Sequence, residues 1–125
     1  MPAQRILVVD DSKFMLEWAS DVLRSAGYEV STCARSLGLT ALVMDQKPDL
    51  VLLDVCMAAL PGDAVCKLLR SNPHTSKVLV ALHSSLPENE LRERSEAAGA
   101  DAYITKSEDS HEFTRKVKEV LARAR

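Results

Sequence analysis

The residues of this chain best suited to chemistry are polar side chains that end apolar runs or directly follow them. They are Asp10, Asp11, Asp54, Ser84 and Lys106. Carboxylates that lie close together repel one another and raise one another's pKa, unless a cation lies among them. Oxygen ligands of this kind suit Mg²⁺, which is often held by one or two carboxylates and a phosphate.

The lysine and the serine complete a set of groups suited to phosphoryl transfer. The ammonium of Lys106 could neutralise one oxygen of a bound phosphoryl group, and the hydroxyl of Ser84 could donate a hydrogen bond to another. Positioning and charge neutralisation are what this transfer requires. A carboxylate can itself be the nucleophile and become an aspartyl phosphate. The set therefore indicates phosphoryl chemistry with an aspartate as the acceptor.

Two kinds of apolar pattern alternate along the chain and predict the elements that must position these groups. Short apolar runs predict strands at residues 6–9, 28–33, 50–55, 78–82 and 102–104. Helical spacing of apolar residues, and a charged segment at 88–98, predict helices at residues 13–26, 37–45, 64–69, 88–98 and 110–122. Ser12 is the expected N-cap of the first helix, and Gly27 is expected just beyond its end.

Strands that alternate with helices predict an α/β fold, with a parallel sheet covered by helices on both faces. Ligands of such sheets bind outside the carboxyl ends of the strands. The five polar side chains should therefore meet at one edge of the sheet. The length of 125 residues and the absence of a linker or repeat predict a single domain over residues 1–125.

Composition excludes several classes of partner. The net charge of −2 and the aromatic content of 4 % provide no basic or stacking surface, so direct binding of nucleic acid or anionic lipid is not expected. No secretory leader or membrane-spanning stretch is recognised, which predicts a cytoplasmic setting. The three cysteines match no metal-binding spacing, and each is expected to be a small, reduced, buried side chain.

The chain resembles the receiver domain of two-component response regulators over essentially its whole length. The resemblance rests on Ile-Leu-Val-Val-Asp-Asp-Ser at 6–12, Pro-Asp-Leu-Val-Leu-Leu-Asp at 48–54, Ser-Ser at 84–85 and Gly-Ala-Asp-Ala-Tyr-Ile-Thr-Lys at 99–106. The interval from Ser84 to Lys106 is the one that such domains normally show. The resemblance implies a flavodoxin-like fold with five parallel strands in the order 2-1-3-4-5.

The resemblance also implies roles for individual residues. Asp54 would accept a phosphoryl group from a histidine kinase or a histidine phosphotransfer protein, with Lys106 and Ser84 contacting that group. Mg²⁺ would be held by Asp10, Asp11, Asp54 and the backbone carbonyl of Cys56. Ser84 and Tyr103 would form a switch, in which the hydroxyl moves toward the phosphoryl group and the ring turns inward.

Such a domain is a signalling module rather than an enzyme with a metabolic substrate, and it would pass its state to an effector protein or an output domain. The two acids that DNA-binding dimers of the family usually carry after Gly-Ala are not both present, since Ala102 follows Asp101. This difference mildly disfavours that mode of dimerisation.

Three departures from the family pattern affect the site. Ser107 follows Lys106 where receivers usually have a proline and a cis peptide bond, so a trans bond is the default here. Ala58 also replaces a usual proline, which should loosen its loop. Cys56 and Leu86 stand at the positions that flank an attacking water, and neither orients water well. A long-lived phosphoryl group is therefore expected.

Other interpretations give these residues ordinary roles. Asp10 and Asp11 could cap a helix, Tyr103 could be a plain core or surface aromatic, and His83 is expected to be packed rather than catalytic. The main alternative function is a pseudo-receiver that binds a partner without phosphorylation. An aspartate-nucleophile phosphatase would need a second acid where Cys56 stands, and a dinucleotide-binding enzyme would need a glycine-rich turn after the first strand.

Overall fold

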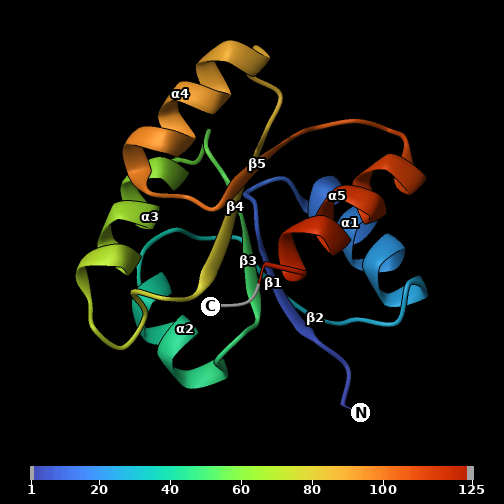
Figure 1. Cartoon of the computed structure of the whole chain (residues 1–125), viewed down its shortest axis with the longest axis horizontal. Coiled ribbons are helices and arrows are strands. Elements are labelled where there is room, and N and C mark those ends of the chain that lie inside the picture. Colours follow the sequence, from blue (N-terminus) through green and yellow to red (C-terminus); the bar gives the residue numbers. More distant parts are fainter. Residues whose placement is uncertain (1, 124–125) are drawn as a thin grey trace.

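The apolar runs of the sequence form one parallel sheet, described in a computed structural model that covers residues 2–123 (Figure 1). Its strands are β1 (Arg5–Val9), β2 (Glu29–Cys33), β3 (Leu50–Asp54), β4 (Leu79–Ser84) and β5 (Ala102–Thr105). The helices that connect and follow them are α1 (Lys13–Ser25), α2 (Leu39–Gln46), α3 (Gly62–Ser71), α4 (Glu88–Ala98) and α5 (Ser110–Leu121).

The strands lie in the order β2-β1-β3-β4-β5, which confirms the predicted flavodoxin-like topology. The chain moves from β1 to β2 on one side and then returns to place β3 on the other side of β1. This reversal makes the carboxyl ends of β1 and β3 the topological switch point, where such sheets bind ligands. Every residue of the central strand β3 is buried, as its continuous apolar run predicts.

Helices cover both faces of the sheet, and alternate strand residues divide between them (Figure 1). On one face α2, α3 and α4 pack over a core that includes Leu7, Val9, Val51, Leu53, Val80 and Leu82. On the other face α1 and α5 pack over a core that includes Ile6, Val8, Leu50, Leu52, Ala81 and Ile104. Burial on both sides holds the strand ends, and the polar residues on them, in fixed positions.

Local chemistry sets the ends of several elements. The Ser12 hydroxyl accepts a hydrogen bond from the Met15 amide at 3.3 Å, which confirms it as the N-cap of α1. Helix α2 begins two residues later than predicted, because Gly38 adopts a left-handed conformation with φ of 78°. Strand β4 extends beyond its apolar run and includes the buried Ser84.

The prediction that all three cysteines are buried is only partly right. Cys66 is fully buried in α3, Cys33 is partly buried, and Cys56 is exposed. Cys56 differs because it lies just beyond the buried strand β3, where the chain emerges into a surface loop. Among residues 2–123, no helix has the length and apolar character needed to cross a lipid bilayer.

Candidate functional site

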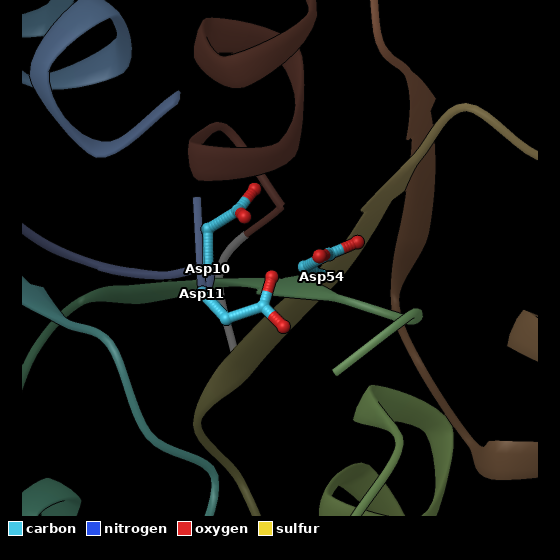
Figure 2. Close-up of side chains that lie close together, drawn as sticks. All are labelled: Asp10, Asp11 and Asp54. Carbon is cyan, nitrogen blue, oxygen red and sulfur yellow. The ribbon is translucent and has the colours of Figure 1, made fainter. Parts of the chain in front are cut away.

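Three aspartates meet at the carboxyl edge of the sheet, as the strand ends predicted. Asp10 and Asp11 follow β1, Asp54 ends the neighbouring strand β3, and one oxygen from each carboxylate lies within 4.8 Å of the others (Figure 2). Asp10 and Asp54 are almost fully buried, whereas Asp11 is exposed. The cluster therefore has two fixed carboxylates and one that opens to solvent.

Backbone amides orient the two buried carboxylates. The Ser12 amide donates to Oδ1 of Asp10 at 2.9 Å, and the Cys56 amide donates to Oδ1 of Asp54 at 3.3 Å. In both cases the donor is two residues after the aspartate, a local turn that aspartate side chains favour. The second bond also places the Cys56 backbone beside the cluster.

Lys106 supplies the positive charge of the site. Its ammonium nitrogen lies 2.9 Å from Oδ2 of Asp10 and 3.5 Å from Oδ1 of Asp54. Its backbone amide donates to the Ser84 carbonyl at 2.8 Å. No cis peptide bond occurs within residues 2–123, so the Lys106–Ser107 bond is trans, as the sequence predicted in the absence of proline.

The electrostatics of this cluster favour a further cation. Burial raises the pKa of Asp54, the Asp10 carboxylate raises it further, and Lys106 partly lowers it. Burial alone would lower the pKa of Lys106, but its bonds to Asp10 and Asp54 raise it above the ordinary value. One ammonium against three carboxylates leaves an excess of negative charge, and hard oxygen donors of this type suit Mg²⁺.

The structure places Ser84 at the same edge as Asp54, on the adjacent strand. Asp54 pairs in register with His83, so Ser84 is the next residue along β4. The Ser84 side chain is fully buried, and its Oγ accepts a hydrogen bond from the Leu86 amide at 3.2 Å. Because Oγ is the acceptor in this bond, the hydroxyl hydrogen of Ser84 is not used in it and can be donated to another group.

Tyr103 lies one strand further from the carboxylates, on the edge strand β5. It pairs in register with Leu82, and its half-buried ring packs against the core on the α2–α3–α4 face. Its hydroxyl donates to Oε1 of Glu88 at 3.1 Å. Tyr103 is therefore outside the acidic cluster, but it contacts the first residue of α4.

Gly62 holds this edge together, a role that the sequence pattern did not indicate. A Cβ atom at this position would lie 2.1 Å from the carbonyl oxygen of Asp54. The Gly62 amide also donates to the Val55 carbonyl at 3.0 Å, which fastens the start of α3 to the end of β3. Only glycine permits this approach, although in the sequence it is simply a glycine that follows Pro61.

His83 is packed as expected. It is 3 % exposed, and its ring centroid lies 5.2 Å from that of Phe113 in α5. Burial, with a contribution from the charge of Lys106, lowers the pKa of His83 to about 4. Its Nε2 has no hydrogen-bond partner among residues 2–123, so the neutral ring is part of the core under the site.

The strand order and the acidic edge together define a flavodoxin-like α/β domain with a site at its topological switch point. Residues 6–118 match the family described as the response regulator receiver domain. The chain therefore belongs to this family and is a receiver domain, a signalling module of two-component systems.

Similar proteins include transcriptional regulators that are longer than this chain. The chain is 31 % identical over 119 residues to the DNA-binding dual master transcriptional regulator RpaA of a Synechocystis species, covering 95 % of this chain and 49 % of that protein. It is 32 % identical over 120 residues to the DNA-binding response regulator MtrA of Mycolicibacterium paratuberculosis, covering 96 % and 52 %. The chain spans about half the length of these regulators.

Solved structures with the same fold span receivers of several kinds. A putative response regulator from Chloroflexus aurantiacus superimposes with a TM-score of 0.91 at 29 % identity, covering 98 % of this chain and 100 % of that one. The chemotaxis protein CheY4 of Vibrio cholerae gives a TM-score of 0.87, covering 95 % and 99 %, and at 24 % identity it supports the fold alone.

Proposed function

We propose that this domain, over residues 1–125, accepts a phosphoryl group on Asp54 from a histidine kinase or a histidine phosphotransfer protein. Residues 1, 124 and 125 of that range lie outside the described part of the chain. The observation that carries the proposal is the position of Asp54. It ends the central strand within 4.8 Å of the other two carboxylates and 3.5 Å from the ammonium of Lys106.

The donor set fits Mg²⁺. The carboxylates of Asp10, Asp11 and Asp54 and the backbone carbonyl of Cys56 would hold the ion. When bound, Mg²⁺ supplies positive charge that neutralises the carboxylates and the oxygens of the incoming phosphoryl group. Because Asp11 is exposed, that side of the cluster is open to a phosphoryl donor.

The geometry of the chain's own groups supports the following transfer. An oxygen of Asp54 attacks the phosphorus of the phosphohistidine, and the phosphorus–nitrogen bond breaks with its electron pair returning to the imidazole. Lys106 neutralises one phosphoryl oxygen, and the Ser84 hydroxyl donates to another. The product is an aspartyl phosphate at the end of β3.

The consequence we propose is a change of partner. Ser84 moves toward the phosphoryl group, the Tyr103 ring turns inward, and the surface formed by α4, β5 and α5 changes. The downstream partner is an effector protein or an output domain. The net charge of −2 offers no attraction for nucleic acid or anionic lipid, so the proposed domain contacts neither. As a partner of a kinase or phosphotransfer protein, it would work in the cytoplasm.

In this proposal the domain catalyses only its own phosphorylation and dephosphorylation and has no metabolic substrate.

All five polar site residues are present and lie at one edge of the sheet, which favours this function over a pseudo-receiver that binds a partner without phosphorylation. The trans bond after Lys106 does not prevent its ammonium from reaching both buried carboxylates.

Intact mass measurement after incubation with Mg²⁺ and a small phosphodonor tests the assignment. The wild type should gain one phosphoryl group and Asp54→Ala should gain none, while Asp21→Ala, which removes an exposed aspartate of α1, should behave as the wild type. A gain in Asp54→Ala would refute Asp54 as the acceptor. No gain in any of the three proteins would favour the pseudo-receiver.

A further inference from the structure

The Tyr103 hydroxyl is bonded to a residue at the beginning of α4. Its hydroxyl donates to Oε1 of Glu88 at 3.1 Å, and Glu88 is the first residue of that helix. The ring is half-buried and packs against the core cluster that includes Leu91 of α4. The side chain thus divides its contacts between the core and one carboxylate at the surface.

The first turn of α4 lacks a capping side chain. Pro87 occupies its N-cap position and makes no side-chain hydrogen bond to the helix, whereas Ser12 caps α1 and Asp109 caps α5. Helix ends without a capping side chain open more readily than capped ends. The Tyr103–Glu88 bond therefore involves the first residue of a helix end that has no side-chain cap.

The remainder of α4 is firmly attached. Arg94 donates two hydrogen bonds to the carboxylate of Asp63 in α3, at 3.0 and 3.1 Å. Arg70 donates to the Gly99 carbonyl at 2.8 Å, which holds the other end of the helix. These contacts hold the later turns of α4, whereas the side chain of Glu88 bonds to Tyr103.

The same turn is joined to the phosphorylation site by a short segment. Oγ of Ser84 accepts a hydrogen bond from the Leu86 amide at 3.2 Å, and Glu88 follows two residues later. If the Ser84 hydroxyl moved toward Asp54, as in the proposed function, this bond would lengthen and the segment 85–87 would be displaced. The segment would then carry the motion of Ser84 to Glu88, which bonds to Tyr103.

We propose that Glu88 is a positioning residue that keeps Tyr103 outward in the resting domain. This inference rests on the proposed function, in which a phosphoryl group on Asp54 draws Ser84 toward it and the ring turns inward. The hydrogen bond between Tyr103 and Glu88, here called the Tyr103–Glu88 latch, then exists only in the resting state. The two events are coupled reciprocally. If phosphorylation makes the latch less stable by some factor, the latch makes phosphorylation less favourable by the same factor.

Loss of the latch should strengthen binding of a phosphoryl mimic. The apparent dissociation constant of a ligand that prefers a minor state falls as the population of that state rises. A typical net hydrogen bond at an exposed position changes that population about three- to tenfold. Glu88→Ala should therefore lower the half-saturating concentration of beryllofluoride, with Mg²⁺ held constant, about three- to tenfold.

The matched control is Glu90→Ala, which removes another acid from the first turn of α4. Both changes take one negative charge from the helix N-terminus, but Glu90 contacts Arg94 at 3.5 Å rather than Tyr103. The chain has two tyrosines, so ¹³C-tyrosine NMR gives two ring signals, and Tyr28→Phe identifies that of Tyr103. In the resting state, Glu88→Ala should move that signal toward its beryllofluoride-saturated position, and Glu90→Ala should leave it unchanged.

A double-mutant comparison separates the latch from a general effect of charge. In a Tyr103→Phe background, which has no hydroxyl to donate, Glu88→Ala should produce no further change in half-saturation. Equal effects of Glu88→Ala and Glu90→Ala, or an undiminished effect in the Phe background, would overturn the latch while the proposed function stands. Failure of the wild type to bind beryllofluoride would overturn the proposed function and the latch with it.

Discussion

The ammonium nitrogen of Lys106 lies closer to Asp10, at 2.9 Å, than to Asp54, at 3.5 Å. The lysine is therefore bound mainly to a proposed metal ligand and only secondarily to the proposed phosphoacceptor. A cation at Asp10 would compete with the lysine there, and a phosphoryl group on Asp54 would attract it. Both changes would move the lysine in the same direction, toward the phosphoryl group of the proposed reaction.

Removal of the Lys106 charge should destabilise the resting domain. Lys106→Met leaves the buried Asp10 carboxylate without its cation, and the free energy of unfolding should fall by about 2–4 kcal/mol. Urea denaturation in the presence of a chelator measures this loss, and Mg²⁺ should restore part of it.

The control is Lys116→Met, which removes a lysine that faces Glu112 at 3.7 Å in a partly exposed pair. That change should alter the stability by less than about 1 kcal/mol. Equal effects of the two substitutions would show that Asp10 does not depend on Lys106.

Gly62→Ala should disrupt the site through the backbone of Asp54. The new Cβ would lie 2.1 Å from the Asp54 carbonyl oxygen, so strand and helix must separate, and the loss of stability should be about 3 kcal/mol or more. Displacement of the nucleophile by about 1 Å can slow a reaction about 100-fold. Phosphorylation followed by intact mass should therefore slow strongly.

Gly38→Ala provides a comparison in which the alanine meets no atoms. Gly38 has a φ of 78°, but nothing lies within 4 Å of a Cβ placed there. Only backbone strain should result, a loss of about 1 kcal/mol, with phosphorylation unchanged. If Gly62→Ala were as mild as Gly38→Ala, the close approach would not be needed for the site.

His83 should make the domain acid-labile. Because its pKa is lowered to about 4 in the fold but is 6.5 for an ordinary histidine, the unfolded chain binds more protons between these values. Stability is thus lost as the pH falls, by about 2 kcal/mol between pH 7 and pH 5. Urea denaturation at both values should show this loss in the wild type.

His83→Leu should remove that component and keep the packing against Phe113. Titration of Asp54 affects both proteins alike, so the difference between them isolates the histidine. An identical pH dependence of stability in the two proteins would mean that the pKa of His83 is the same in the folded and the unfolded chain.

The phosphoryl group should be long-lived, because neither residue that flanks the expected path of water orients it. Leu86 is half-buried against the core, and Cys56 offers only a thiol. Leu86→Gln supplies an amide that can position water, so decay after gel filtration should accelerate about three- to tenfold. Leu68→Gln, at an exposed leucine of α3, should leave the rate unchanged. Unchanged or slower decay in Leu86→Gln would contradict this account.

The order of elements was predictable because it depends on short-range patterns. The apolar run before Asp54 and the helical spacing after Ser12 report burial and periodicity directly. Errors arose where a backbone feature outweighed the pattern. Gly38 delays the start of α2 through its left-handed conformation, and β4 continues through polar Ser84 because pairing with β5 persists there.

The fold class and the set of strand ends at which polar side chains meet were predictable from the residues, since parallel topology brings these ends to one edge. Three contacts were visible only once the domain was folded: Lys106 lies closer to Asp10 than to Asp54, Gly62 approaches the Asp54 carbonyl, and Tyr103 bonds to Glu88. These contacts join segments distant in the chain. Their lengths depend on how the whole domain packs, which no local pattern encodes.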